Sequence, residues 1–186
     1  MCIRDRIKKL SYPLDHNFKK TKSTIILIGK TFGHIEQSCF LKENFSTSEG
    51  LPPEINLNNE KNNGETVLKL IRKNLVLSVH DVSSGGLLVS LSEMSIGSNL
   101  GAKIYKPKKL NNKFEYFFGE DQGRYIIEIK PKNLENVENM LKKDSIHFDK
   151  LGLVEGNEIM LENDLKISIE DIKEGYKKWL KEYMVN

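Results

Sequence analysis

The 186-residue sequence predicts a single α/β domain in which helices pack on a mixed β-sheet. The run TIILIG at 24–29 is rich in β-branched residues and is typical of a buried strand. The apolar run at 75–80 leads through a polar turn and two glycines into an amphipathic helix over 86–97. A third apolar run, RYIIEIK at 124–130, predicts another strand. Strands that alternate with helical patterns indicate the α/β class.

The other elements follow from hydrophobic spacing and turn chemistry. Val67, Leu70 and Ile71 form the inner face of a helix expected at 57–73. Shorter helices are expected at 35–44, 108–118 and 134–141, and further strands at 101–106, 146–156 and 157–163. The Gly156-Asn157 pair predicts a hairpin turn between the last two strands.

The last segment, 168–184, predicts a helix that Ser168 caps and Asp171 supports from the third position. Its apolar residues recur on one face, which leaves two possibilities open. The face packs on the sheet of this domain, which is the commoner case, or it packs on a neighbouring domain.

Charge is distributed unevenly along the chain. Residues 1–30 hold eight Lys or Arg and two Asp, whereas the rest of the chain is net acidic. The body has no basic face, so nucleic-acid binding is not indicated. We interpret 1–22 as a solvated, basic lead-in, with 1–6 as a candidate non-native remnant, and 23–186 as the domain.

Cysteine content and hydropathy bear on the compartment. The chain has two cysteines, too few for a disulfide framework, and their spacing is not that of a metal site. No apolar run reaches the length of a membrane span, and the first residues lack the apolar stretch of a secretory signal. We therefore expect a cytoplasmic protein without membrane contact.

The turn between the 75–80 strand and the 86–97 helix carries the most chemical information. It contains His80, Asp81, Ser83, Ser84, Gly85 and Gly86. The glycines let a ligand approach the backbone, and the N–H groups at a helix N-terminus favour an anion. Asp81 is placed to hold a divalent cation that the anion shares. The turn therefore predicts a phosphate or Mg-nucleotide site.

A purely structural interpretation of the same turn stays open. Asp and Ser cap helices without any ligand, and glycine pairs mark tight packing. His80 is more commonly a satisfied strand-end histidine than a catalyst. No residue of this chain is predicted to be catalytic.

A second motif, FFGEDQGR at 117–124, follows the turn and leads straight into a strand. Together the series HDVSSGG, LSEM, GA and FFGEDQGR resembles the C-terminal module of the AIR synthase-related family. Within that family it looks most like the last such module of PurL-type phosphoribosylformylglycinamidine synthases. The resemblance runs from about IILIGKTFG at 25–33 to ISIEDIKEGYKKWL at 167–180.

The resemblance implies an activity for the assembled enzyme. Such synthases use ATP, Mg²⁺ and glutamine-derived ammonia to amidate formylglycinamide ribonucleotide in purine biosynthesis. Because this chain resembles one module only, it should be inactive alone. The implied partners are the preceding synthase modules, a glutaminase subunit and a small accessory subunit.

Site residues carry over one by one. In the family's earlier copy of this module, the Asp matching Asp81 binds Mg²⁺, and the segment matching Glu120, Asp121 and Gln122 contacts the nucleotide. In the second copy, which this chain resembles, the same places line a pseudo-symmetric site that is often regarded as structural or auxiliary. We predict that phosphate or nucleotide contacts come from Ser83, Ser84, Gly85, Gly86, Glu120, Asp121, Gln122 and Arg124. The chain has Ser84 and Asp121 where the family commonly has Asp and Ser, so the site would keep its net charge if the motifs face each other.

Arg124 and the module as a whole each have a competing interpretation. Arg124 suits a bidentate phosphate contact, but a salt bridge to Glu120 is the simpler prediction. The module could likewise be a non-catalytic scaffold, or an auxiliary nucleotide-binding module of another AIR synthase-superfamily protein.

Overall fold

A seven-stranded mixed sheet forms the centre of the protein. The computed structural model describes residues 14–105, 112–162 and 164–185, and the strand order is β2-β4-β1-β5-β3-β6-β7. All the neighbouring strands pair antiparallel except β3 and β6, which are parallel, so the predicted mixed α/β sheet is confirmed. The strands are β1 (Thr24–Ile28), β2 (Val76–Asp81), β3 (Ala102–Ile104), β4 (Tyr125–Ile129), β5 (Phe148–Val154), β6 (Glu158–Leu161) and β7 (Leu165–Ser168).

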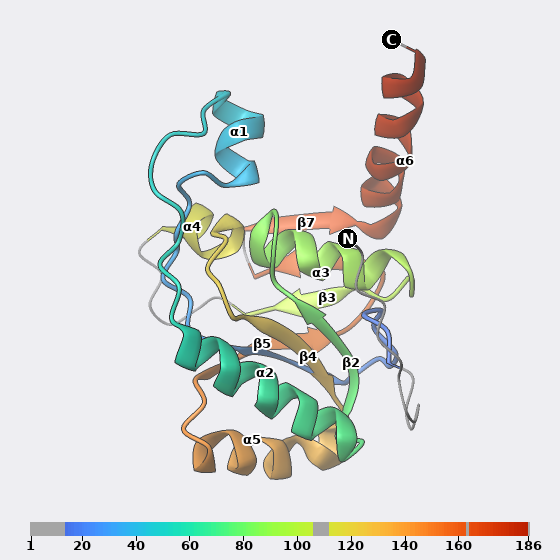
Figure 1. Cartoon of the computed structure of the whole chain (residues 1–186). Coiled ribbons are helices and arrows are strands. Elements are labelled where there is room, and N and C mark those ends of the chain that lie inside the picture. The colour runs from blue at the N-terminus through green and yellow to red at the C-terminus, as the bar shows by residue number, and fades with distance from the viewer. Residues whose placement is uncertain (1–13, 106–111, 163, 186) are drawn as a thin grey trace.

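Helices cover both faces of the sheet. Two of them, α2 and α5, lie on one face, while α3 and α4 lie on the other (Figure 1). The helices are α1 (Cys39–Phe45), α2 (Leu57–Arg72), α3 (Gly86–Ile96), α4 (Lys113–Phe118), α5 (Leu134–Lys143) and α6 (Ile169–Val185), with a short 3-10 turn, η1 (Pro131–Asn133). The helices predicted at 57–73, 86–97 and 134–141 are confirmed. Those predicted at 35–44 and 108–118 are shorter than expected, and 106–111 lie outside the described residues.

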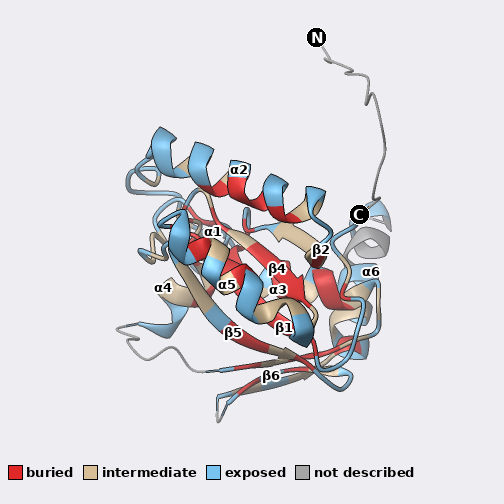
Figure 2. Ribbon diagram, turned by 90° about the horizontal axis from the view of Figure 1, so that it is seen from below, coloured by how far each residue is buried: buried red, intermediate tan, exposed pale blue. Residues whose placement is uncertain are grey.

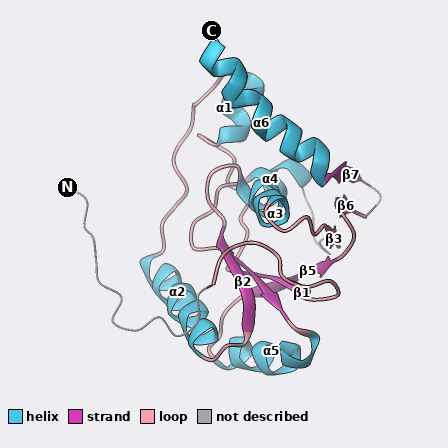
Figure 3. Ribbon diagram, turned by 90° about the vertical axis from the view of Figure 1, so that its right-hand side faces the viewer, coloured by secondary structure: helices cyan, strands magenta, loops and turns pink. Residues whose placement is uncertain are grey.

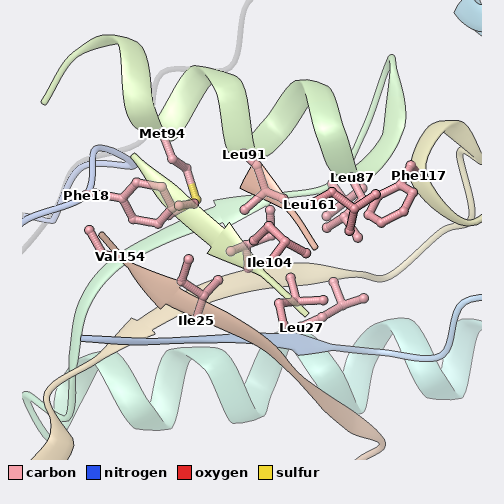
Figure 4. Close-up of a cluster of buried hydrophobic side chains, with 14 residues drawn as sticks. Phe18, Ile25, Leu27, Leu87, Leu91, Met94, Ile104, Phe117, Val154 and Leu161 are labelled. Carbon is pink, nitrogen blue, oxygen red and sulfur yellow. The ribbon is translucent and has the colours of Figure 1, made fainter. Parts of the chain in front are cut away.

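Strand β1 is the centre of two hydrophobic cores, and all five of its residues are buried. Successive side chains of a strand point to opposite faces. Ile25 and Leu27 therefore enter the cluster beneath α3 (Figure 4), and Ile26 and Ile28 enter the cluster beneath α2 and α5. Figure 2 shows the buried residues gathered on the sheet and on the inner sides of these helices. Burial on both faces explains the continuous apolar run of β1.

The predicted hairpin at Gly156-Asn157 is wrong. Strand β3 lies between β5 and β6 and pairs with both of them. The turn wraps around Gly101, whose N–H donates to the Gly156 carbonyl at 2.8 Å, while the Glu155 N–H donates back to the Gly101 carbonyl at 2.9 Å. A Cβ at Gly101 would lie 2.2 Å from the Glu158 carbonyl oxygen, so a glycine is needed here. This contact comes from a residue far upstream, and local turn chemistry does not reveal it.

The closing helix α6 starts as predicted, directly after the unpredicted strand β7. The Asp171 N–H donates to the Ser168 hydroxyl at 3.0 Å, which confirms the cap. Ile169 is buried, but Tyr176 and Tyr183 are 73% and 68% exposed. Figures 1 and 3 show α6 projecting from the body. Packing on this domain is thus confirmed for the start of the helix. Tyr176 and Tyr183, further along the same apolar face, are exposed.

Part of the lead-in is not solvated, contrary to expectation. Phe18 is 2% exposed within the core under α3, and its N–H donates to the Met94 carbonyl at 3.0 Å. Ser23, the first residue of the domain, is fully buried beside Glu128. Residues 1–13, which include the candidate remnant, lie outside the described residues. Among the described helices, none has the length and apolar character needed to cross a membrane.

Candidate functional site at the β2–α3 turn

The glycine pair of the turn is required by packing within the chain. Gly85 and Gly86 have φ values of 83° and 73°, in the left-handed region that favours glycine. A Cβ at Gly86 would lie 2.8 Å from the Gly119 carbonyl oxygen and from the backbone of Phe118. The close approach expected of a ligand is thus made at Gly86 by the backbone of the second motif.

The two motifs meet through one carboxylate. A single oxygen of Glu120, Oε1, accepts hydrogen bonds from the Gly85 N–H and the Cys39 N–H, both at 2.8 Å. Gly85 is the N-cap of α3 and makes no side-chain cap bond of its own. Cys39 is the first residue of α1. The Glu120 carboxylate therefore holds two helix N-termini together, where negative charge is favourable.

The Asp121 carboxylate binds backbone groups in the interior of the domain. The Asp121 carboxylate is 4% exposed and accepts from the backbone N–H groups of Phe32, Gly33 and His34 at 3.0–3.1 Å. Asp121 therefore fixes the loop after β1, and its negative charge faces the N–H groups of that loop.

The guanidinium of Arg124 makes three hydrogen bonds within the chain. Its Nε donates to the Asp121 carbonyl at 3.2 Å, its Nη2 to the Gly119 carbonyl at 2.6 Å and its Nη1 to the Thr31 hydroxyl at 3.3 Å. Its charge partner is the Asp121 carboxylate at 3.8 Å, so the predicted salt bridge to Glu120 is wrong. Burial lowers the pKa of Arg124, and the neighbouring Asp121 carboxylate opposes this shift.

His80 is held on both sides of its ring. Its Nδ1 lies 2.6 Å from the Asp81 carbonyl and its Nε2 lies 3.0 Å from the Glu93 carboxylate. The His16 ring lies 5.0 Å away, measured between centroids. These contacts agree with a structural histidine and give it no free nitrogen in the described part of the chain.

Most of the predicted site residues line a single cleft of about 280 Å³. They are Asp81, Ser83, Ser84, Glu120, Gln122 and Arg124. Asp121 lines a second cleft of about 480 Å³, formed by the loop after β1, α2 and the 145–147 turn. Gly85 and Gly86 line neither cleft. The two clefts share Glu60 and Gln122, so they adjoin.

Helix α2 contributes residues that sequence motifs did not identify. Glu60 lines both clefts, and the Asn63 amide donates to the Gly123 carbonyl at 2.9 Å. Both residues are polar and lie on the side of an amphipathic helix that faces the second motif. The polar character of these two residues was the only signal of a site in the sequence, and polar residues also suit a solvated helix surface.

In the described part of the chain, the oxygens that could bind a metal ion at this turn are not gathered into a cluster. The Asp81 side chain is 67% exposed at the end of β2, and its Oδ1 lies 3.5 Å from His80 Nδ1. Within the described residues, no three His, Cys, Asp or Glu side chains lie close enough to hold a metal ion. Mg²⁺ commonly binds one or two carboxylates and completes its shell with water and phosphate oxygens. Asp81 fits that mode, whereas an all-protein cage is not formed.

Comparison with known proteins identifies the family. The family model for the C-terminal domain of AIR synthase related proteins matches residues 23–160. The phosphoribosylformylglycinamidine synthase subunit PurL of Pelagibacter ubique is 47% identical over 180 residues, which is 97% of this chain and 25% of that relative. The chain thus spans about a quarter of the length of this curated relative.

Two solved structures share the fold. Thermotoga maritima PurL complexed with ATP matches with a TM-score of 0.64 and 18% identity, over 84% of this chain and 26% of that one. The structure of PurLQS from the same organism matches with a TM-score of 0.63 and 19% identity, over 84% and 27%. The family model covers most of the sequence, and the solved structures have the same fold. This chain therefore belongs to the AIR synthase related family and corresponds to the C-terminal domain of its members.

Proposed function

We propose that this chain is the closing AIR synthase-related module of a phosphoribosylformylglycinamidine synthase. The observation that carries the proposal is the 47% identity to a PurL subunit along 97% of this chain. The assembled enzyme would amidate formylglycinamide ribonucleotide with ATP and ammonia. Its partners would be the preceding modules, a glutaminase subunit and a small accessory subunit, and the PurLQS neighbour supports a multi-subunit assembly.

The proposed chemistry gives the first cleft a defined part. ATP phosphorylates the amide oxygen of the substrate, and ammonia then displaces the phosphate. In this scheme Asp81 would hold Mg²⁺, while Ser83, Ser84 and Gln122 would offer hydrogen bonds. The charge of the metal ion would stabilise the negative charge that develops on a transferring phosphoryl group.

An auxiliary or scaffold role is the second candidate, and a specific observation favours it. Glu120, Asp121 and Arg124 were predicted to contact a nucleotide, yet each makes hydrogen bonds within the chain. In this role the cleft would bind a structural Mg-nucleotide, and the chemistry would take place elsewhere in the enzyme.

A chimera tests the proposed function directly. Residues 14–186 would replace the matching segment of the Pelagibacter ubique relative, and product formation would be measured with formylglycinamide ribonucleotide, ATP and ammonia. We expect the chimera to be active and this chain alone to be inactive. A folded but inactive chimera would contradict the proposal, as would turnover by the isolated chain.

The variant Asp81→Asn separates the two candidate roles. In the chimera we expect it to lower kcat at least tenfold with little change in melting temperature, because a metal ligand is lost at an exposed position. The control is Asp144→Asn, which alters a surface carboxylate paired with Lys69 at 3.1 Å. An unchanged kcat together with a lower melting temperature would support the auxiliary role instead.

A further inference from the structure

Residues 35–55 form a segment with very little anchorage. Ser38 is the only buried residue among them, and helix α1 within the segment has no buried residue. Figure 1 shows α1 standing apart from the sheet and joined to α2 by a long loop. Segments with few buried contacts open at a low free energy compared with the core.

The 35–55 segment has its own internal hydrogen bonds. The Leu51 N–H donates to the Glu36 carboxylate at 2.8 Å, and the Gln37 amide donates to the Gly50 carbonyl at 2.7 Å. These bonds close the loop on itself without involving the sheet. The segment can therefore move as a unit while keeping them.

Firm attachment ends just before this segment begins. The N–H groups of residues 32–34 are bonded to the buried Asp121 carboxylate, and the Glu120 N–H donates to the His34 carbonyl at 2.8 Å. At the other end, Asn56 caps helix α2, whose Val67 and Leu70 enter the core. Residues 35–55 thus lie between two fixed points.

Contacts at the start of α1 hold the segment against the body, together with a bond of 2.8 Å between His34 Nε2 and the Leu51 carbonyl. The Cys39 N–H donates to Glu120 Oε1, the same oxygen that accepts from Gly85. The Phe40 ring stacks on the Phe118 ring with 4.7 Å between centroids. The bond to Glu120 is charge-assisted, and such bonds are about twice as strong as neutral ones.

The position of the segment gives its opening a consequence. Pro53 and Glu54 form part of the wall of the larger cleft, whose opposite wall comes from the body of the domain. The Glu120 carboxylate lines the smaller cleft together with Asp81. Movement of the 35–55 segment therefore changes access to the larger cleft, and it removes a hydrogen bond from a carboxylate that lines the smaller one.

We propose that the 35–55 segment is a lid over the larger cleft and that Glu120, which lines the adjoining smaller cleft, is its latch. Release of the Cys39 N–H from Glu120 frees the start of α1 from its charged partner. The Phe40 contacts with Phe114 and Phe118 and the bond between His34 and Leu51 then resist opening. Glu120 acts as a positioning residue, because one of its oxygens ties the lid to the β2–α3 turn. Opening of the lid does not depend on which reaction the assembled enzyme performs.

Hydrogen exchange on the 186-residue chain, read by mass spectrometry, tests the lid. We expect the amides of 39–45 to exchange at least tenfold faster in Glu120→Ala than in the wild type, since the variant lacks the charge-assisted bond that holds the start of α1. Amides of β1 and of α3 beyond its first turn should keep their rates. Trypsin cleavage after Lys42 gives a second readout, because Lys42 is the only Lys or Arg in the segment.

A matched pair of variants isolates the latch. Glu120→Gln and Glu36→Gln make the same chemical change, but the Glu36 carboxylate accepts its hydrogen bond within the lid, from the Leu51 N–H. Faster exchange at 39–45 and faster cleavage in Glu120→Gln, but not in Glu36→Gln, would support the proposal. Equal acceleration across the whole chain in Glu120→Ala would overturn it, as would wild-type exchange at 39–45 as slow as that of β1.

Discussion

Glu128 is the residue whose burial is least expected from its type. It is fully buried in β4 and accepts four hydrogen bonds. The donors are the Lys20 N–H and Ser23 hydroxyl to one oxygen, and the Lys19 N–H and Ser78 hydroxyl to the other, at 2.6–2.9 Å. A buried carboxylate is tolerated when its acceptor sites are satisfied in this way. Glu128 thereby fixes the end of the lead-in to the sheet.

We expect Glu128→Gln to lower the free energy of unfolding by about 2–3 kcal/mol, because an amide NH₂ would face donors that need an acceptor. Urea denaturation measures the change. Glu158→Gln is the control, since Glu158 makes a surface ion pair with Lys166 at 3.0 Å, and such pairs contribute about 0–1 kcal/mol. Equal losses in the two variants would show that the Glu128 bonds are not stabilising.

At the scale of elements, the turn before α3 and the segment that ends α4 pack closely against each other. Gly86 begins α3, and the end of α4 and Gly119 pack directly on it. The sequence predicted the helix and its glycines correctly but assigned the glycines to a ligand. That assignment was uncertain because the same conformational freedom serves a ligand and a neighbouring backbone alike.

Two glycine variants separate backbone strain from collision. Gly86 and Gly156 have similar φ values of 73° and 68°, so an alanine at either position has a comparable backbone cost. A Cβ at Gly86 meets backbone at 2.8 Å, whereas a Cβ at Gly156 meets nothing within 4 Å. We expect Gly86→Ala to destabilise by about 1–3 kcal/mol more than Gly156→Ala in thermal unfolding. A smaller cost at Gly86 would mean that the end of α4 shifts easily to make room for the added methyl group.

For the whole molecule, sequence patterns predicted the fold class and most helices and strands, because each follows from local spacing of apolar residues. The order of the strands was not predictable in this way. The insertion of β3 between β5 and β6 depends on contacts between segments far apart in the chain. The site shows the same division. The residues of the two motifs were found, but the internal bonds of Asp121 and Arg124 and the contribution of Glu60 depend on tertiary packing.

The stability of the whole domain should depend on pH through Tyr116. Burial, with a smaller effect from Asp149, raises the pKa of Tyr116 to about 12. An unfolded chain has a tyrosine pKa of about 10, so the folded form retains the proton between these values and stability falls as pH rises from about 10 to 12. The effect is at most about 2 kcal/mol, at 1.4 kcal/mol per pKa unit with an allowance for partial exposure. We expect Tyr116→Phe to remove this part of the slope in urea denaturation, and an unchanged slope would contradict the assignment.

The central place of β1 has a consequence for synthesis of the chain. Its partners are β4 at 125–129 and β5 at 148–154, so the most apolar strand emerges from the ribosome long before either neighbour exists. Until then the TIILI run has two open edges and two apolar faces, which are the features of an aggregation-prone strand. Nascent chains that end before residue 125 should therefore bind hydrophobic dyes and chaperones, and chains that extend past 154 should lose this binding.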